Sequence, residues 1–283
     1  MNRLSTEKRA ALLRSLVDGA SVSAASRMIG VSKVTALKLL ADIGEVCAEY
    51  QRATLNDLPC RTIECDEIWS WVGAKEKNVP RDEKGRGRGD VWTWTAICAD
   101  TKLIPCWHLG TRDANAAALF MEDLASRLRH RVQLTTDGHR AYLRGVEGAF
   151  GWNGVDYAML MKIYGPAPEG QTRYSPPQII GAQAEWVMGN PDPKRISTSY
   201  AERQNQTMLM NMRRFTRLTN VFSKKMENHA HALALYFMHY NFCRPHQTLT
   251  KAKGGIKQTP AMAAGVADHA WTMEEVVGLL GQV

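Results

Sequence analysis

Three acidic side chains stand out by their positions rather than by their abundance. Asp66 lies in the middle of an aromatic and β-branched segment, Asp137 ends a short apolar segment, and Glu202 lies near the start of a helical one. Carboxylates at adjacent strand ends and on a packed helix can converge on one point. Two hard divalent cations roughly 4 Å apart prefer such oxygen ligands, and together they activate an attacking oxygen and stabilise a leaving one. The pattern therefore indicates phosphodiester chemistry at a site with two Mg²⁺ (or Mn²⁺) ions.

The neighbours of Asp66 favour a functional role over a solvent-facing one. Ile68 and Trp69 predict a buried central strand, in which a carboxylate is costly unless it has a metal or a polar partner. Successive side chains of a strand face opposite sides, so Glu64 and Asp66 share one face and Glu67 takes the other. We therefore expect only one of Asp66 and Glu67 to enter the site.

The third acidic residue has a competitor. Glu185 lies in the phrase AQAEWVMG, within a stretch rich in proline and glycine that precedes Glu202. Glu202 is favoured because Arg203 and Asn205 follow it, but Glu185 stays an alternative.

The elements that position these residues follow from the periodicity of the chain. Alternating and β-branched segments predict strands over residues 62–72, 91–100, 103–109, 132–136 and 157–163. Helical spacing predicts helices over residues 115–128, 141–146, 199–215 and 225–242. An exposed hairpin loop is expected at 75–90 and a loop-rich insertion at 165–198. This order predicts an α/β fold, an RNase H-like domain with a mixed β-sheet flanked by helices.

The first fifty residues predict a small all-α domain. Three short helices are expected over residues 6–18, 21–29 and 32–43, and Gly30 permits the positive φ of a sharp turn between the last two. The segment SRMIGVSKVTALKLL resembles the helix-turn-helix of bacterial DNA-binding proteins. Its exposed residues would face the major groove: Ser32, Lys33, Thr35 and Lys38. The alternative is a generic three-helix packing or dimerisation module.

The predicted organisation is a helix-turn-helix domain at 1–50, a linker at 51–60, a catalytic domain at 61–250 and a C-terminal tail with a short helix at 251–283. Charge is unevenly distributed over it. Residues 191–258 carry 12 basic and 3 acidic side chains, whereas residues 1–50 carry 7 and 5. With a net charge of +8, the chain is suited to a polyanionic partner such as nucleic acid.

Composition excludes several classes of protein. Apolar residues make up 45% and charged residues 23% of the 283 positions, which are ordinary globular proportions. The six cysteines include no C-x-x-C pair, which argues against a zinc ribbon and a secreted disulfide framework. We expect no membrane span and no signal peptide, and hence a cytoplasmic, nucleoid-associated protein.

Five motifs in order carry a resemblance to a known family. DEIWSWVGAKEKN, DVWTWTAICADTK, TRDANAA, TTDGHRAY and YAERQNQTMLMNMRRFTRLTNVFSK together resemble the DDE transposases of bacterial insertion sequences, with the closest likeness to the family of insertion sequence one. The resemblance implies an RNase H-like fold, Mg²⁺ dependence, and DNA strand cleavage and transfer at terminal inverted repeats. It implies a catalytic and metal-binding triad of Asp66 in DEIW, Asp137 in TDG and Glu202 in AERQN.

The partners expected on this basis are double-stranded DNA, both element ends and target, and a second copy of the chain, because pairing two ends requires at least a dimer. Near Glu202 lie further residues predicted to bind DNA: Arg203, Asn205, Arg213, Arg214, Arg217, Lys224, Lys225 and Arg244. Two other functions stay open. One is a helix-turn-helix regulator with an inactive RNase H-like domain, and the other is a structure-specific nuclease that cuts without joining.

Overall fold

A single mixed sheet forms the centre of the protein, which we describe from a computed structural model covering residues 4–152, 154–165, 178–216 and 222–281. Its strands lie in the order β3-β2-β1-β4-β5-β6. They are β1 (Thr62–Val72), β2 (Gly89–Cys98), β3 (Trp107–Gly110), β4 (Val132–Asp137), β5 (Val155–Tyr164) and β6 (Ile179–Met188). The five predicted strands are thus confirmed, with β1 at the predicted bounds and the others within a few residues, and β6 is additional.

The strand pairing places β1 and β4 side by side at the centre of the sheet. β1 runs antiparallel to β2 and parallel to β4, β4 runs parallel to β5, and β5 runs antiparallel to β6. Most side chains of β1 and β4 are buried because helices cover both faces. This mixed, helix-flanked sheet is compatible with an RNase H-like fold.

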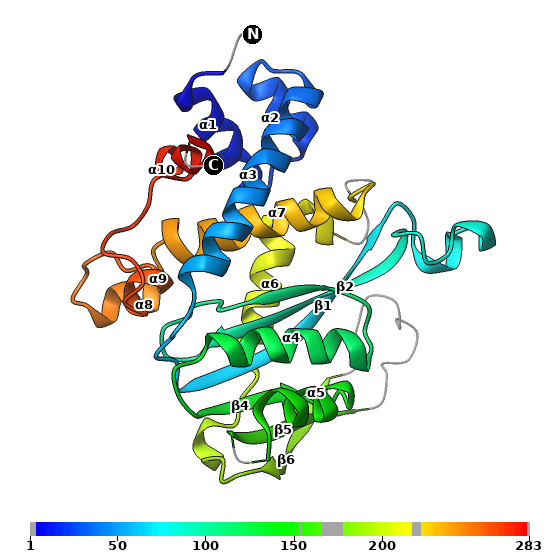
Figure 1. Ribbon diagram of the computed structural model, residues 1–283, viewed down its shortest axis with the longest axis vertical. Coiled ribbons are helices and arrows are strands. Elements are labelled where there is room, and N and C mark those ends of the chain that lie inside the picture. Colours follow the sequence, from blue (N-terminus) through cyan, green and yellow to red (C-terminus); the bar gives the residue numbers. More distant parts are fainter. Residues whose placement is uncertain (1–3, 153, 166–177, 217–221, 282–283) are drawn as a thin grey trace.

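Different helices cover the two faces of the sheet (Figure 1). On one face, Trp94 of β2 packs against Phe120 of α4 (Ala114–Arg127) and edge-on against Tyr142 of α5 (Ala141–Phe150). On the other face lie α6 (Ser199–Asn211) and α7 (Met226–Met238), and Phe237 of α7 stacks on Trp107 of β3. The helices predicted at 199–215 and 225–242 are confirmed. The first is followed by a 3₁₀ turn at 213–215, and the second continues into a π-helical turn at 239–243.

The three N-terminal helices form as the sequence predicts. They are α1 (Thr6–Val17), α2 (Val22–Ile29) and α3 (Lys33–Thr54). Ser5, Ser21 and Ser32 each cap the following helix by accepting a backbone N–H, as serine commonly does at this position. Gly30 ends α2 with φ +72°, in the left-handed region that glycine adopts without strain.

Helix α3 is longer than expected and extends into the linker predicted at 51–60. It continues past residue 50 to Thr54, and its second half packs on α7, where Gln51 donates Nε2 to the Ala234 carbonyl at 3.0 Å. Apolar residues at helical spacing continue beyond Ile43, and Val46 and Cys47 among them are buried. The first part of the expected linker is therefore a continuation of the helix.

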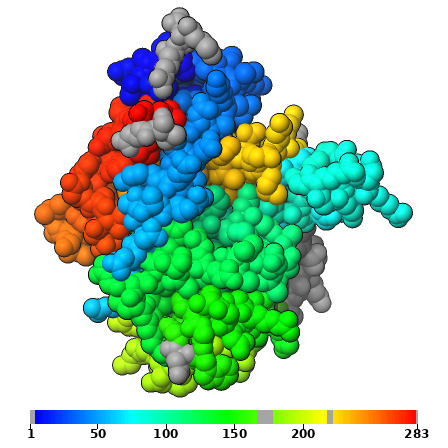
Figure 2. Space-filling model, in the orientation of Figure 1, coloured from blue at the N-terminus to red at the C-terminus, as the bar shows by residue number. Residues whose placement is uncertain are grey.

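The sequence predicts a tail with one short helix at 251–283. Its described residues contain α9 (Pro260–Ala263), α10 (Met273–Gly278) and the 3₁₀ turn Leu279–Gly281, and α8 (Gln247–Ala252) extends into its start. Buried Val276 and Val277 of α10 join the apolar core, and Glu274 pairs with Arg14 of α1 at 3.3 Å. The space-filling view shows this segment against the N-terminal helices (Figure 2). The end of the chain thus packs on its beginning.

Two further segments were expected to be loops. The 165–198 insertion contains β6, which pairs along β5; residues 166–177 of the insertion lie outside the described residues. The loop between β1 and β2 stands out from the body with two short 3₁₀ turns, Glu76–Asn78 and Arg81–Glu83 (Figure 2). Among the described residues, no helix combines the length and apolarity needed to cross a membrane.

Candidate metal centre

Glu64 and Asp66 of β1 face helix α6 and hold it at two points. The buried Glu64 carboxylate accepts the N–H groups of Tyr200 at 2.7 Å and Ala201 at 3.1 Å, in the first turn of α6. A carboxylate there satisfies free N–H donors and suits the positive end of the helix dipole. One turn later, Asn205 donates Nδ2 to Asp66 Oδ2 at 2.9 Å. Glu202 lies between these two attachments and is thereby brought beside β1.

The environment of Asp66 disfavours its ionised form. Burial raises its pKa to about 7, and the negative charges of Glu67, Asp137 and Glu202 add to the effect. The backbone N–H of Glu67, which donates to Oδ1 at 2.9 Å, opposes it. A divalent cation between these carboxylates would remove the repulsion that raises the pKa.

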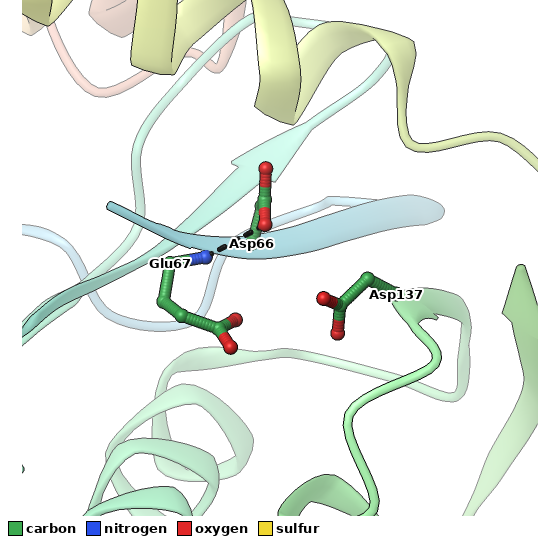
Figure 3. A group of neighbouring side chains, drawn as sticks. All are labelled: Asp66, Glu67 and Asp137. Carbon is green, nitrogen blue, oxygen red and sulfur yellow. Dashed lines mark hydrogen bonds between the residues drawn. The ribbon is translucent and has the colours of Figure 1, made fainter. Parts of the chain in front are cut away.

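Asp66, Glu67 and Asp137 form a group in which one carboxylate oxygen from each lies within 4.8 Å of the others. The expectation that Asp66 and Glu67 cannot share a site is therefore wrong. Figure 3 shows that their side chains do leave opposite faces of β1, as strand alternation requires, while Asp137 lies at the end of the neighbouring strand. The pairing of β1 with β4 stops at Cys65 and Thr136, so the ladder between the two strands ends just before Asp66 and Asp137.

Glu67 is nevertheless already bonded through both of its oxygens. Arg112 donates Nε to Oε1 at 2.7 Å and the buried Tyr142 donates its hydroxyl to Oε2 at 2.9 Å. Asp137, by contrast, accepts a hydrogen bond from a described residue at Oδ1 alone, from the His139 backbone at 3.0 Å. Asp137 is the better placed of the two to bind a cation.

The two candidates for the third acid lie in different places. Glu202 accepts from Thr198 Oγ1 at 2.5 Å and pairs with Lys162 of β5, whose Nζ is 2.5 Å from Oε1. The negative charge of Glu202 helps to raise the pKa of Asp66, although its oxygens lie outside the close group formed by Asp66, Glu67 and Asp137. Glu185 lies on the edge strand β6, opposite Met159 of β5, and is exposed.

The donor atoms suit a hard divalent cation. Besides the carboxylates, Asn205 Oδ1 is buried without a hydrogen-bond partner among the described residues, on the same amide that donates to Asp66. A carbonyl oxygen without a partner beside carboxylates is a suitable ligand for Mg²⁺ or Mn²⁺. Four carboxylates (Asp66, Glu67, Asp137 and Glu202) stand against two cationic side chains, Arg112 and Lys162, which leaves a negative excess for metal binding. The close acidic group could therefore hold a metal ion through Asp66 and Asp137, with Asn205 Oδ1 on the amide that bonds to Asp66, whereas Glu202 lies outside this group.

The residues predicted to bind DNA fall into three groups. Lys33, Arg213, Arg214 and Lys224 line one cleft of about 390 Å³ between the N-terminal helices and the α6–α7 region. No carboxylate is among the described residues that line it. Exposed positions elsewhere are Lys38, Arg203, Lys225 and Arg244. Ser32 and Thr35 bond to each other through their hydroxyls at 2.8 Å, Asn205 belongs to the carboxylate site, and Arg217 lies outside the described residues.

Sequence reasoning missed four side chains that shape the site: Glu64, Arg112, Tyr142 and Lys162. Strand alternation already placed Glu64 on the face of Asp66, and Arg112 and Tyr142 lie in the motifs TRDANAA and TTDGHRAY. No local signal indicates Lys162, because only the pairing of β5 in the sheet brings it to Glu202.

No protein-family model matches the chain, and no curated protein matches it. Among solved structures, the chain is similar to the crystal structure of the Mos1 strand transfer complex, with 11% sequence identity over 83% of this chain and 77% of that chain. The TM-score of the match is 0.24, which is too low to establish a common fold. The function is therefore inferred from the residues of the site themselves.

Proposed function

We propose that this protein is a DDE transposase that cleaves and joins DNA strands at the terminal inverted repeats of an insertion sequence, with two Mg²⁺ or Mn²⁺ ions. The observation that supports the proposal is the grouping of Asp66 on β1 with Asp137 at the end of β4, together with the charge of Glu202 on α6 that acts on Asp66 and an Asn205 Oδ1 that has no partner among the described residues. Oxygen ligands of this kind are what two-metal phosphoryl transfer requires.

The chain's own residues have separate tasks in this reaction. Asp66, Asp137 and Glu202 hold the ions, which when bound supply the Lewis acid for both reacting oxygens. Asn205 orients Asp66, and Glu64 fixes the helix that carries Glu202. Water attacks the phosphodiester at the element end and leaves a 3′-hydroxyl and a 5′-phosphate. That hydroxyl then attacks target DNA, and a target 3′-oxygen departs as the new bond forms.

DNA binding belongs to the same proposal. The exposed face of α3 carries Lys33 and Lys38 for the major groove, and the cleft next to it adds Arg213, Arg214 and Lys224. Each cation near a phosphate contributes to affinity without reading sequence. Two copies of the chain would be needed to pair two element ends.

Cleavage and joining of labelled duplexes with the element's terminal repeats test this proposal in Mg²⁺, in Mn²⁺ and in EDTA. We expect nicking at the repeat end and joined product with metal, loss of both in D66N, D137N and E202Q, and retained activity in the matched variant E185Q. Nicking without joining would indicate the nuclease instead. Tight binding of the repeat without cleavage in either metal would indicate a regulator and contradict the proposal.

A further inference from the structure

Arg112 lies between β3 and α4 and extends over the carboxylate group. Its guanidinium carbon is 4.6 Å from the centre of the Trp92 ring on β2, within the range of a cation–π contact. Nε donates to Glu67 Oε1 at 2.7 Å, and one terminal nitrogen is 3.7 Å from Asp137 Oδ2. The latter separation is an ion-pair contact and is too long for a hydrogen bond.

The ion pair has a buried end and an exposed end. The Glu67 side chain is 1% exposed, whereas that of Arg112 is 39% exposed. Tyr142 is buried and donates to the other Glu67 oxygen, and its ring packs edge-on against Trp94 at 5.1 Å. Glu67 is thus fixed from within the protein, and it fixes the orientation of the arginine in turn.

The guanidinium has donors to spare. Of its five N–H groups, only the one on Nε makes a hydrogen bond to a described residue. The terminal nitrogens are the pair that binds two oxygens of a phosphate at once. They lie next to Asp137, at the point where the proposed metal ligands meet.

We propose that Arg112 binds the non-bridging oxygens of the scissile phosphate, with Glu67 and Tyr142 as positioning residues rather than metal ligands. The inference rests on the proposed function, since it presumes a phosphodiester at this site. Arg112 stays protonated throughout and offsets the charge that develops on the phosphoryl oxygens. Glu67 belongs to the acidic group, but both of its carboxylate oxygens already accept hydrogen bonds. Its role is therefore to position Arg112 rather than to bind metal.

Single-turnover cleavage separates this role from metal binding. We expect R112Q to lower the cleavage rate about 100-fold or more, while the half-saturating Mg²⁺ concentration changes less than threefold. E67Q and Y142F should also lower the rate, because the arginine loses its orientation. The control R129Q removes an exposed ion pair with Asp57 far from the site and should behave as wild type. Cleavage by R112Q within threefold of wild type would overturn the proposal. So would loss of Mg²⁺ saturation in E67Q, because that would make Glu67 a metal ligand.

A binding cycle decides the same question without catalysis. The probes are two duplexes in Ca²⁺, one natural and one with an uncharged methylphosphonate in place of the phosphate at the repeat end. Wild type should bind the natural duplex more tightly than the methylphosphonate duplex, and R112Q should lose about tenfold of that preference, provided that its melting temperature shows it to be folded; the Ca²⁺ contribution to the preference is common to both proteins. A preference in R112Q as large as that of wild type contradicts the role of Arg112 even if wild type cleaves. Absence of cleavage by wild type contradicts the proposed function alone.

Discussion

Lys162 forms an ion pair with Glu202, one of the carboxylates that the proposed metal binding requires. Its ammonium group lies on Glu202, and both side chains are partly exposed. Replacement by methionine keeps the apolar stem and removes the charge. We expect Lys162→Met to lower the half-saturating Mg²⁺ concentration for cleavage by about threefold to tenfold, the size of an ion pair worth ~1 kcal/mol.

Lys84→Met provides the matched control, because Lys84 pairs with Glu76 on the exposed hairpin at 3.5 Å. It should leave the Mg²⁺ requirement unchanged. An unchanged or higher requirement in Lys162→Met would mean that Lys162 does not compete with metal at Glu202.

A second residue of interest is His229 on α7, which is fully buried between two hydroxyls. Its Nε2 lies 3.3 Å from Ser70 Oγ on β1 and its Nδ1 lies 3.0 Å from Ser223 Oγ, which also bonds to Arg214. Burial, with the nearby positive charge of Arg214, lowers the pKa of His229 to about 3. The histidine is therefore neutral in the folded protein at any ordinary pH.

This lowered pKa makes stability depend on pH. Between about pH 6.5 and pH 3 the unfolded chain binds a proton at His229 that the folded protein does not bind, so stability falls as the pH falls. From pH 7.5 to 5.5, wild type should lose about 1.4 kcal/mol more free energy of unfolding than His229→Gln. Urea denaturation at the two pH values measures the difference. The control His130→Gln, at an exposed position, should lose as much free energy of unfolding as wild type between the two pH values. An equal loss in wild type, His130→Gln and His229→Gln would refute the expectation.

The packing of α3 against α7 depends on a glycine. A Cβ atom at Gly44 would lie 2.4 Å from the His231 Cβ and 2.6 Å from its Cα, closer than two carbons can approach. The two helices therefore meet at backbone distance, and this contact joins the N-terminal helices to the helices that cover the sheet.

We expect Gly44→Ala to destabilise the protein by about 1–3 kcal/mol, because the helices must separate, although alanine favours a helix. Gly148 in α5 is the matched position, with no heavy atom within 4 Å of an added Cβ. Gly148→Ala should stabilise by up to about 1 kcal/mol. Thermal or denaturant unfolding of both variants gives the two signs, and stabilisation by Gly44→Ala would show that α3 and α7 do not pack this closely.

At the level of the entire protein, positive charge gathers where distant segments meet. Lys33 of α3 and Lys224 before α7 are far apart in the sequence yet line one cleft, although the N-terminal fifty residues carry little net charge by themselves. A phosphate backbone in this cleft would contact both parts of the molecule at once. Such binding releases counterions, so its affinity falls as salt rises.

The slope of log affinity against log salt concentration reports these contacts. Lys33→Gln and Lys224→Gln should each lower the slope for duplex DNA by about 1, and the double variant by about 2, with similar effects on all sequences. Lys251→Gln, exposed on α8, serves as the control. Slopes equal to that of wild type would place the DNA elsewhere on the surface.

The sequence by itself determined those features that depend on near neighbours in the chain. Alternating aromatic and β-branched residues define β1 at its observed bounds. Serines mark the starts of the three N-terminal helices, and Gly30 marks the end of α2. Asp66 and Asp137 could be singled out because each lies on a strand that periodicity reveals. These signals are local, so no knowledge of the partner segments is needed to interpret them.

Only the tertiary structure decided how the two faces of β1 relate to one site. The pairing of β1 with β4 ends at Cys65, and just beyond it Glu67 joins Asp66 and Asp137 in one group despite strand alternation. The strand β6 lies in a segment where proline and glycine predict loops, and it pairs along β5 in the folded protein. Long-range pairing likewise brings Lys162 to Glu202 and Arg112 to Glu67, because contacts between distant segments depend on sheet order and register, which local periodicity does not specify.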